Sequence, residues 1–347
     1  MRKIVSILFI LNSIVCFADG HHRRNDTLHI FNKIDTTYIT DYHDLLNAKM
    51  ICVVRTNKFS VTDNVSQSKL EYSINTNANF GLGVSCKGIG VDFEYNPPGL
   101  NNDDYKYGKS KQLSFSTDAN GRRFIYNAYY RYNQGYHTTS TFRIPGDTTG
   151  ASEYIYRPDI KNTNVGGELI YVVNNKRFSS SAPYNLTQKQ RKSAGSLLAG
   201  TFASLYTIDA DSLIFPDSVK NKFKPEVQFK NAGSITWGIS CGYTYTLIFA
   251  KNWFVNIYTL PGVALQQYYS TNAFNQQTHT NLSFGASLQS RFSIGYNRKN
   301  YYIGISWMNT TYFVDNDKKA SLSYNNGVFH FYYGHRFDIR KFLKRFM

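Results

Sequence analysis

The chemistry to consider first is that of a serine nucleophile with a histidine base. Ser283 and Ser306 share the C-terminal region with the histidines His279, His330 and His335. If strands brought such a pair together, it could hydrolyse an ester bond of a membrane lipid, as a phospholipase does. Serine is plentiful throughout the chain, so chance pairs are expected, and hydroxyls facing a polar interior explain these residues without catalysis. We expect no catalytic residues, with a lipid-modifying enzyme as the alternative.

Cysteine and histidine give no recognisable metal site. Cys52, Cys86 and Cys241 are odd in number, far apart and without the paired spacing of a zinc site or a disulfide framework. We expect them to be small apolar residues on strands. His21 and His22 are adjacent, and a flexible, exposed pair explains them better than a metal site. The sequence also lacks a glycine-rich phosphate loop, so we expect neither a metal ion nor another cofactor.

A second group of residues consists of charged side chains set within rows of small or hydroxylated residues. Such side chains could pair across a polar interior, or fill that interior where it is narrow. The candidates for the lining of a lumen are Lys87, Asp92, Glu94, Arg131, Glu168, Arg291 and Arg336. Their placement depends on the elements that carry them, which the pattern of hydrophobicity predicts.

Polar and apolar residues alternate along much of the chain, most clearly over positions 234–249. Apolar or aromatic residues occupy every second position from Ile235 to Phe249, and the residues between them up to Thr246 are Ser, Thr or Gly. Positions 281–296 repeat the pattern, with Arg291 in the polar row. A period of two indicates a β-strand with two unlike faces. In a membrane barrel the apolar face meets lipid and the polar face looks into the lumen.

This alternation predicts an all-β protein, a transmembrane antiparallel up-and-down β-barrel of about twelve strands. The expected strands cover residues 50–62, 76–87, 88–97, 109–118, 122–135, 164–174, 194–208, 233–249, 252–268, 280–297, 300–313 and 325–337. Every second connection is tight and the others are longer, as expected for periplasmic turns and extracellular loops. One connection breaks the rule, the long segment 175–193 on the side of the tight turns.

A soluble periplasmic β-sandwich that binds a ligand would show a similar alternation and is a further alternative. Three observations favour the barrel. The expected strands reach about ten residues or more, whereas strands of soluble proteins average about six. Aromatic residues make up 16% of the chain, more than a soluble core needs, and rings at a membrane interface would account for them. The polar rows combine Gly, Ser and Thr with both signs of charge, which suits a confined interior.

The N-terminus has the pattern of a secretory signal peptide. Arg2 and Lys3 precede an apolar run that ends at Phe17, with the small residue Ala18 before the expected cleavage point. The run is shorter than the roughly 20 residues that a membrane-spanning helix needs. We therefore divide the chain into a signal peptide, a periplasmic N-terminal segment, the barrel and a basic C-terminal tail, at residues 1–18, 19–49, 50–337 and 338–347.

The chain is strongly basic, with a formal net charge of +16 that becomes +14 once the two basic residues of the signal peptide are removed. No basic helix, zinc spacing or RNA-binding motif accompanies this charge, and export argues against a nucleic-acid partner. Anionic outer-membrane lipids and lipopolysaccharide are the expected neighbours. The barrel assembly machinery is the other expected partner, and we favour a monomer.

Residues in and after the segment 175–193 form motifs that resemble a known family. These are Phe178, Ser179, Gln190, Lys192, Ser193, Ala194, Gly195, Ser196 and Gly200, with further likeness at 35–39 and 209–212. In them the chain resembles domain-of-unknown-function family 4421, predicted outer-membrane proteins of Bacteroidetes. The resemblance covers nearly the whole mature chain and implies an outer-membrane location in a Gram-negative bacterium, but no activity. Ser180 and Ser181 depart from the pattern, in which Arg or Tyr is more usual.

The long segment 175–193 has two interpretations. It is either a periplasmic or lumen-inserted segment that plugs the pore or contacts a partner, or a basic loop against lipid head groups. For the whole chain we expect a small channel, a solute or lipid conduit, or an envelope-structural protein.

Overall fold

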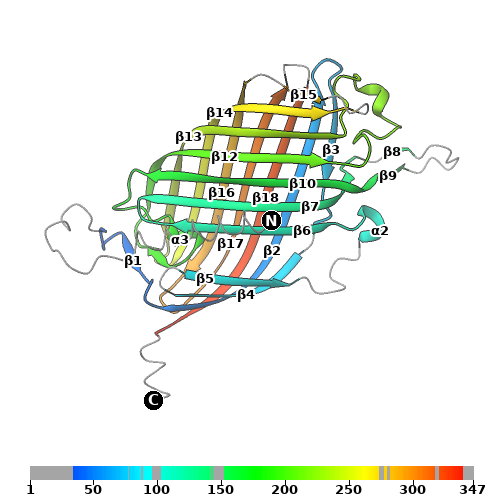
Figure 1. The fold of residues 1–347 in the computed structure, drawn as a ribbon. Helices are drawn as coiled ribbons and strands as arrows, with labels where there is room; N and C mark the ends of the chain where they lie inside the picture. The colour runs from blue at the N-terminus through cyan, green and yellow to red at the C-terminus, as the bar shows by residue number, and fades with distance from the viewer. Residues whose placement is uncertain are drawn as a thin grey trace.

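The alternating segments form one antiparallel sheet that curls round and closes on itself (Figure 1). The computed structural model describes residues 34–76, 78–86, 89–95, 103–140, 142–143, 152–272, 277–279, 282–316 and 320–338. The sheet has 14 strands, and ten of them make a closed ring, because the last strand of the chain pairs with the first long one. A single sheet that closes in this way is a barrel, and the two-sheet sandwich is wrong.

The ring contains, in order round the barrel, β18 (Ala320–Phe337), β17 (Tyr301–Asn316), β16 (Ser283–Asn297), β14 (Trp253–Thr271), β13 (Asn231–Phe249), β12 (Ala194–Asp209), β10 (Tyr156–Val172), β7 (Phe124–Thr138), β3 (Ser68–Ser73) and β2 (Leu46–Asp63). Four strands pair onto this ring from outside its path: β4 (Ala78–Cys86), β5 (Ile89–Tyr95), β6 (Lys111–Asn120) and β15 (Gln277–His279). Short strands make two separate pairs, β1 (Ile39–Asp41) with β11 (Gln188–Gln190), and β8 (Phe142–Arg143) with β9 (Ser152–Glu153).

Each of the twelve expected segments coincides with a strand of the sheet, and most ends agree within a few residues. The alternation predicted neither β3 nor β15, so the sheet holds 14 strands. β3 arises because the stretch from Ser68 to Cys86 bends near Asn75 and pairs as two strands. β2 begins at Leu46, inside the expected 19–49 segment, because Leu46 to Lys49 pair with the last residues of β18. The expected signal peptide and most of the expected tail lie outside the described residues.

The two faces of each strand differ as the sequence predicts, and β13 shows it best. Its odd-numbered residues from Ile235 to Phe249 are exposed on the outside of the barrel, and most of the even-numbered residues are buried inside. Ile239 is 62% exposed and its neighbour Ser240 only 9%. The apolar row therefore faces outward and the hydroxyl row faces the lumen.

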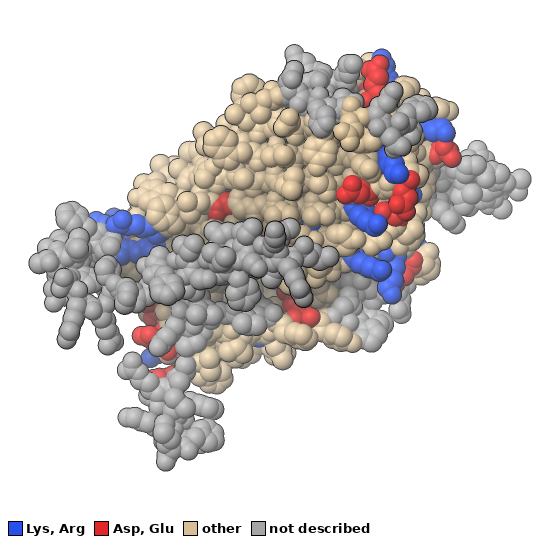
Figure 2. All heavy atoms as spheres, viewed as in Figure 1, with Lys and Arg blue, Asp and Glu red and all other residues tan. Residues whose placement is uncertain are grey.

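Apolar side chains cover the outside of the barrel wall. Exposed large apolar or aromatic residues occur on every long strand of the ring, among them Met50, Trp237, Ile257, Phe284 and Phe331. In Figure 2 the side of the barrel is largely uncharged, and acidic and basic residues gather mainly at its two ends. An apolar belt of this extent is stable against lipid and not against water. Among the described residues, no helix is both long and apolar enough to cross a bilayer.

The two ends of the barrel differ in their connections. At one end, which we call the turn end, residues 121–123, 250–252 and 298–300 make tight turns, and Ala250 and Lys251 adopt positive φ angles of 44° and 67°. The opposite end, the loop end, carries the long connections, including helix α2 (Asp104–Tyr107). Strand β1 and helix α3 (Ser181–Tyr184) lie at the turn end (Figure 1).

The outward and inward faces of β13 can be distinguished by one substitution at adjacent positions. We expect Ile239→Lys to lower the free energy of unfolding by about 2–4 kcal/mol, because an ammonium group among lipid chains loses its hydration without a partner. Ser240→Lys should cost clearly less, since the lumen offers polar neighbours. Urea unfolding of the protein in lipid vesicles measures both, and equal losses would contradict the assigned facing.

Candidate functional site

The lumen at the turn end is filled by the connection between β10 and β12, residues 173–193, which we call the turn-end plug. Within it Phe178 is buried against Ile170, Leu198 and other inward residues of the wall. Leu186 is buried against Val53, Phe254 and their neighbours on the other side of the lumen. Side chains from opposite parts of the wall thus enclose this segment. Of the two interpretations of 175–193, the structure shows the lumen-inserted segment.

Hydrogen bonds fix helix α3 of the plug to inward polar residues of the wall. The Tyr184 hydroxyl donates to Asn256 Oδ1 at 2.5 Å, and the Ser293 hydroxyl donates to the Pro183 carbonyl at 3.0 Å. Asn256 and Ser293 are both fully buried. These bonds satisfy polar groups that would otherwise be buried without partners. Neither Tyr184 nor Asn256 was singled out in the sequence, because no local pattern pairs them.

Arg336 fixes the end of the plug to the last strand. It is 4% exposed, and its guanidinium donates to the Leu186 carbonyl, to Asn297 Oδ1 at 3.1 Å and to the Arg298 carbonyl at 2.7 Å. It also lies over the rings of Tyr42 and Tyr302. Arg336 is therefore a predicted lumen residue whose hydrogen bonds hold the plug against the wall.

Gln190 organises the inside of the plug. Its side-chain oxygen accepts from the Ser179 N–H at 2.9 Å, and its nitrogen donates to the Arg177 carbonyl at 2.6 Å and the Lys192 carbonyl at 2.9 Å. The Ser179 hydroxyl in turn accepts from the Ala182 N–H, at the start of α3, at 3.1 Å. A Gln and a Ser eleven residues apart thus close the segment into a loop.

The other family-like residues join the plug to the neighbouring strands. Ser193 Oγ accepts from the Ile248 N–H, and Ser196 Oγ accepts from the Asn174 N–H, each at 2.9 Å. At Gly195 and Gly200 an added Cβ would lie within 2.8 Å of backbone oxygens of adjacent strands, so both positions require glycine. Ala194 is buried beside Phe178 in the same cluster, and Lys192 lies over the Tyr38 ring. The departures Ser180 and Ser181 donate to carbonyls of the β6–β7 turn.

Glu168 and Arg291 meet inside the barrel. Arg291 Nη2 donates to Glu168 Oε1 at 2.9 Å, and Gln289 Nε2 donates to both carboxylate oxygens, at 3.1 and 3.0 Å. The pair joins β10 to β16, which three other strands separate in the ring. Arg291 also lies over the Tyr258 ring and over Tyr184 of the plug. This cluster couples the wall to the plug.

The remaining lumen candidates are placed as follows. Glu94 pairs with Arg55 of β2, with a 2.7 Å bond from Nη2 to Oε1. Arg131 lies over the Tyr129 ring, 4.0 Å from its centroid. The Lys87 residue and the Asp92 side chain lie outside the described residues. Arg55 is a charged residue of the lumen that the sequence interpretation omitted, although it has the same parity as the inward residues of β2.

A second segment, residues 210–230, closes the loop end, and we call it the loop-end plug. Ile214, Phe215, Phe223 and Phe229 are buried in a cluster with inward residues of seven or more strands, Tyr72 among them. The Tyr72 hydroxyl donates to the Ile214 carbonyl at 2.5 Å. Both ends of the lumen are therefore occupied by the protein's own chain.

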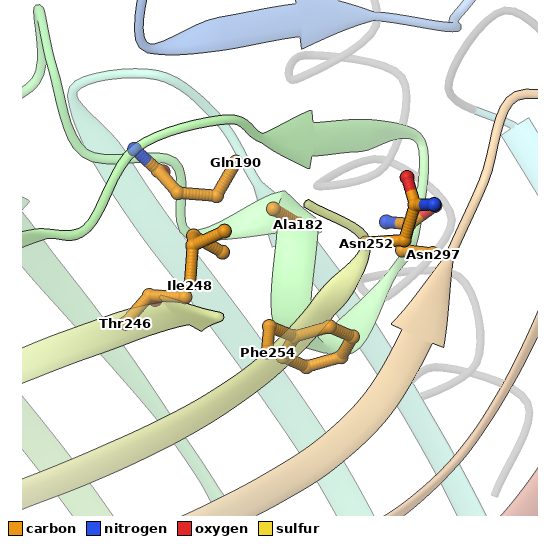
Figure 3. A pocket seen from close by; sticks show the side chains of 7 residues that line it. All are labelled: Ala182, Gln190, Thr246, Ile248, Asn252, Phe254 and Asn297. Carbon is orange, nitrogen blue, oxygen red and sulfur yellow. The ribbon is translucent and has the colours of Figure 1, made fainter. Parts of the chain in front are cut away.

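A small pocket lies between the turn-end plug and the wall (Figure 3). It is lined by Ala182, Gln190, Thr246, Ile248, Asn252, Phe254 and Asn297. Beside it, Lys189 donates to Asn252 Oδ1 at 2.6 Å. Burial, followed by the positive charges of Arg191, Arg336 and Arg298, lowers the pKa of Lys189 below its usual value. The turn end thus concentrates positive charge around the plug.

The serine and histidine candidates do not assemble a catalytic pair in the described part of the chain. Ser306 and His330 are cross-strand partners of β17 and β18, but no hydrogen bond joins them there, and Ser306 is buried. Ser283 donates to the Gln266 carbonyl, and His335 stacks on Phe337 at the turn end. The His279 side chain lies outside the described residues. No cluster of three or more His, Cys, Asp or Glu that could hold a metal occurs in the described ranges.

Comparison with known proteins gives one family and several distant folds. The family model described as domain of unknown function (DUF4421) matches residues 33–337. No curated protein matches the sequence. The outer-membrane protease OmpT of Escherichia coli is 10% identical, with a TM-score of 0.38 over 86% of this chain and 98% of its own.

Two further solved structures are more distant still. The toluene transporter TodX of P. putida is 8% identical, with a TM-score of 0.28 over 85% of this chain and 90% of its own. Ail, the attachment invasion locus protein of Yersinia pestis, is 10% identical, with a TM-score of 0.20 over 84% of this chain and 99% of its own. Similarities at this level carry no argument about the activity of this chain.

The Glu168–Arg291 pair can be tested by removing one charge and then both. Arg291→Met leaves a buried carboxylate without its cation, so we expect the free energy of unfolding to fall by about 3–5 kcal/mol. The double variant Glu168→Leu with Arg291→Met removes both charges and should regain most of that loss. Urea unfolding in lipid vesicles measures both. A double variant as unstable as the single one would show that the charge pair is not the source of the loss.

Proposed function

Because this chain belongs to domain-of-unknown-function family 4421 and forms a barrel with an apolar exterior, we propose that it is an outer-membrane conduit for small solutes or lipids, closed along its axis at rest. The lumen is not a continuously open pore in this proposed resting state. The observation that carries it is a lumen that holds two charge pairs and is occupied at both ends by the protein's own chain. A barrel with an unobstructed lumen would instead suit a general pore.

The proposed location rests on three features. The exposed apolar belt suits a bilayer, since it would be unstable in water. Residues 1–18 have the pattern of a signal peptide, so export before membrane insertion is part of the proposal. The turn end, with the tight turns, then faces the periplasm of a Gram-negative bacterium. Outer-membrane lipids and lipopolysaccharide would surround a monomeric barrel, and the barrel assembly machinery would insert it.

The conduit interpretation rests on the chemistry of the lumen. The interior holds the Glu168–Arg291 and Arg55–Glu94 pairs, and a purely structural barrel gains little from buried charges, which cost desolvation. The turn-end plug is held largely by polar bonds, such as those of Tyr184 and Arg336. Polar contacts can exchange for water or ligand contacts when a segment moves, which a fully apolar plug does not allow.

We expect the mature protein to sediment with outer membranes and to resist carbonate extraction, because its apolar belt lies within the bilayer. Unboiled protein should migrate faster than boiled protein on a mild-detergent gel, since the closed barrel stays compact. Membrane fractionation checks the first expectation, and gel electrophoresis checks the second. Recovery as a soluble periplasmic protein would end the outer-membrane proposal.

Axial closure predicts an absence of steady ion conductance by the wild-type protein in planar bilayers. Conducting steps should require truncations at both ends, Tyr184→Ala and Leu186→Ala at the turn end combined with Phe215→Ala and Phe223→Ala at the loop end, because side chains of a plug fill the lumen at each end. Tyr105→Ala is the control, since that ring is exposed on α2. Heat-dependent gel migration confirms that each variant is folded. Steady conductance of the wild type would contradict the proposed axial closure.

A further inference from the structure

The barrel wall forks where β2 changes its partner. Residues 58–63 of β2 pair with β3, whereas residues 47–54 pair with β4, which carries β5 on its other side. On the opposite flank, β7 pairs with β6 over residues 125–134 and with β3 only at 137–138. Within the described residues, β5 pairs only with β4 and β6 only with β7. One edge of β5 and one edge of β6 are therefore unpaired below the point of closure, and the ribbon leaves a gap between these two strands (Figure 1).

Hydrogen bonds frame this gap, which we call the window, at its upper and lower margins. At the loop end, Asn75 accepts from Gln112 Nε2 through its carbonyl, at 3.4 Å, and donates to Asp103 Oδ1 through Nδ2, at 3.1 Å. At the turn end, Asn120 Nδ2 donates to Asn185 Oδ1 of the turn-end plug at 2.9 Å. The window is thus a stretch, fixed at both ends, where β5 and β6 each lack a strand partner.

Side-chain exposure shows that β6 is accessible on both of its faces at the window. Phe93 of β5 and Phe115 of β6 face outward and are 71% and 57% exposed, so lipid borders both edges. Ser114 and Ser116 of β6 face inward, because they pair with the inward residues Arg131 and Tyr129, yet both are exposed. Inward serines of the continuous wall, such as Ser240, are buried.

A row of polar side chains leads from the window along the inside of the wall. Cross-strand partners share a face, and the register places Ser114, Arg131, Asn164, Tyr206 and Ser234 in one row across five strands. The last three are fully buried. Among the described residues, both amide atoms of Asn164 and the hydroxyl of Tyr206 have no hydrogen-bond partner. Buried polar atoms in this state call for a bound polar group or water.

The unpaired backbone groups of the two sheet edges also need hydrogen-bond partners at the window. Unpaired backbone N–H and C=O groups are unstable in hydrocarbon, so an open sheet edge facing lipid needs a polar occupant. A lipid-like molecule meets both demands, because its head can bond to the edges and to the row while its tail stays in the bilayer. Arg131 favours a head that carries negative charge.

We propose that the window is a lateral entry through which an acyl-chain amphipath with an anionic head moves between the bilayer and the lumen. The head binds Arg131 and Asn164, and the acyl chain leaves between Phe93 and Phe115. This inference rests on the proposed conduit function and deepens it, since closure at both ends leaves the wall as the route.

Quenching of a fluorophore by nitroxide-labelled lipid tests the opening. Single cysteines are introduced as Ser116→Cys, Ile239→Cys and Ser240→Cys after the native cysteines are replaced, labelled with bimane, and reconstituted in phosphatidylglycerol vesicles containing acyl-chain doxyl lipid. We expect quenching at position 116 comparable to that at the lipid-facing position 239 and several-fold greater than at the lumen position 240. If position 116 behaves like position 240, the window is overturned and the conduit proposal stands. If position 239 is not quenched, the membrane assignment and the window both fail.

The head group is tested at the same labelled position with three quenchers: doxyl-labelled phosphatidylglycerol, phosphatidylcholine and stearic acid. We expect an anionic quencher to act several-fold more strongly than phosphatidylcholine, and Arg131→Gln to remove that excess. Lys251→Gln, which removes a positive charge from an exposed turn, should leave it unchanged. An excess for phosphatidylglycerol identifies a phospholipid, and an excess for stearic acid alone identifies a free fatty acid. Equal quenching by all three would overturn the assigned ligand.

Discussion

The structure depends on one constraint: backbone N–H and C=O groups within hydrocarbon need hydrogen-bond partners, and outside the window the sheet itself supplies them. A sheet meets this demand only by closing, and here closure joins β18 to β2 along the full length of both strands. Closure in turn sets the alternation of each strand, because one face must suit lipid and the other a narrow interior. The long apolar rows and the hydroxyl rows of the sequence both follow from it.

A ring of ten strands leaves an interior too narrow to stay empty and too wide for wall side chains alone. Aromatic rings fill part of it, as where Tyr206 stacks on Tyr324 with 3.8 Å between centroids. The two plugs fill the ends. Four of the charged residues within the interior form two pairs, Glu168 with Arg291 and Glu94 with Arg55, because an unpaired buried charge is costly. Packing and charge pairing inside the lumen are thus both consequences of the closure of the ring.

The sequence could predict the wall far better than the interior. Alternation over 234–249 identified strand β13 and the facing of almost every residue in it, because a period of two is a local property. It could not predict that β2 divides its pairing between β3 and β4, since β3 is only six residues long. Nor could it bring Tyr184 to Asn256, because contacts inside a lumen join residues by the curvature of the whole sheet. The long connection at 175–193 was recognisable as unusual, while its place in the lumen depended on the closed ring.

The pairing of β2 with β18 also has a consequence for the order of folding. Asn57 and Asn326, which share a 2.7 Å hydrogen bond in this pair, are 269 residues apart in the chain. Contacts of such separation form late, since the loop between them must first lose its conformational freedom. The turn-end plug belongs to the middle of the chain and lies inside the finished ring. It must therefore take its place while the sheet is still open, so that the final strand closes over a lumen already filled.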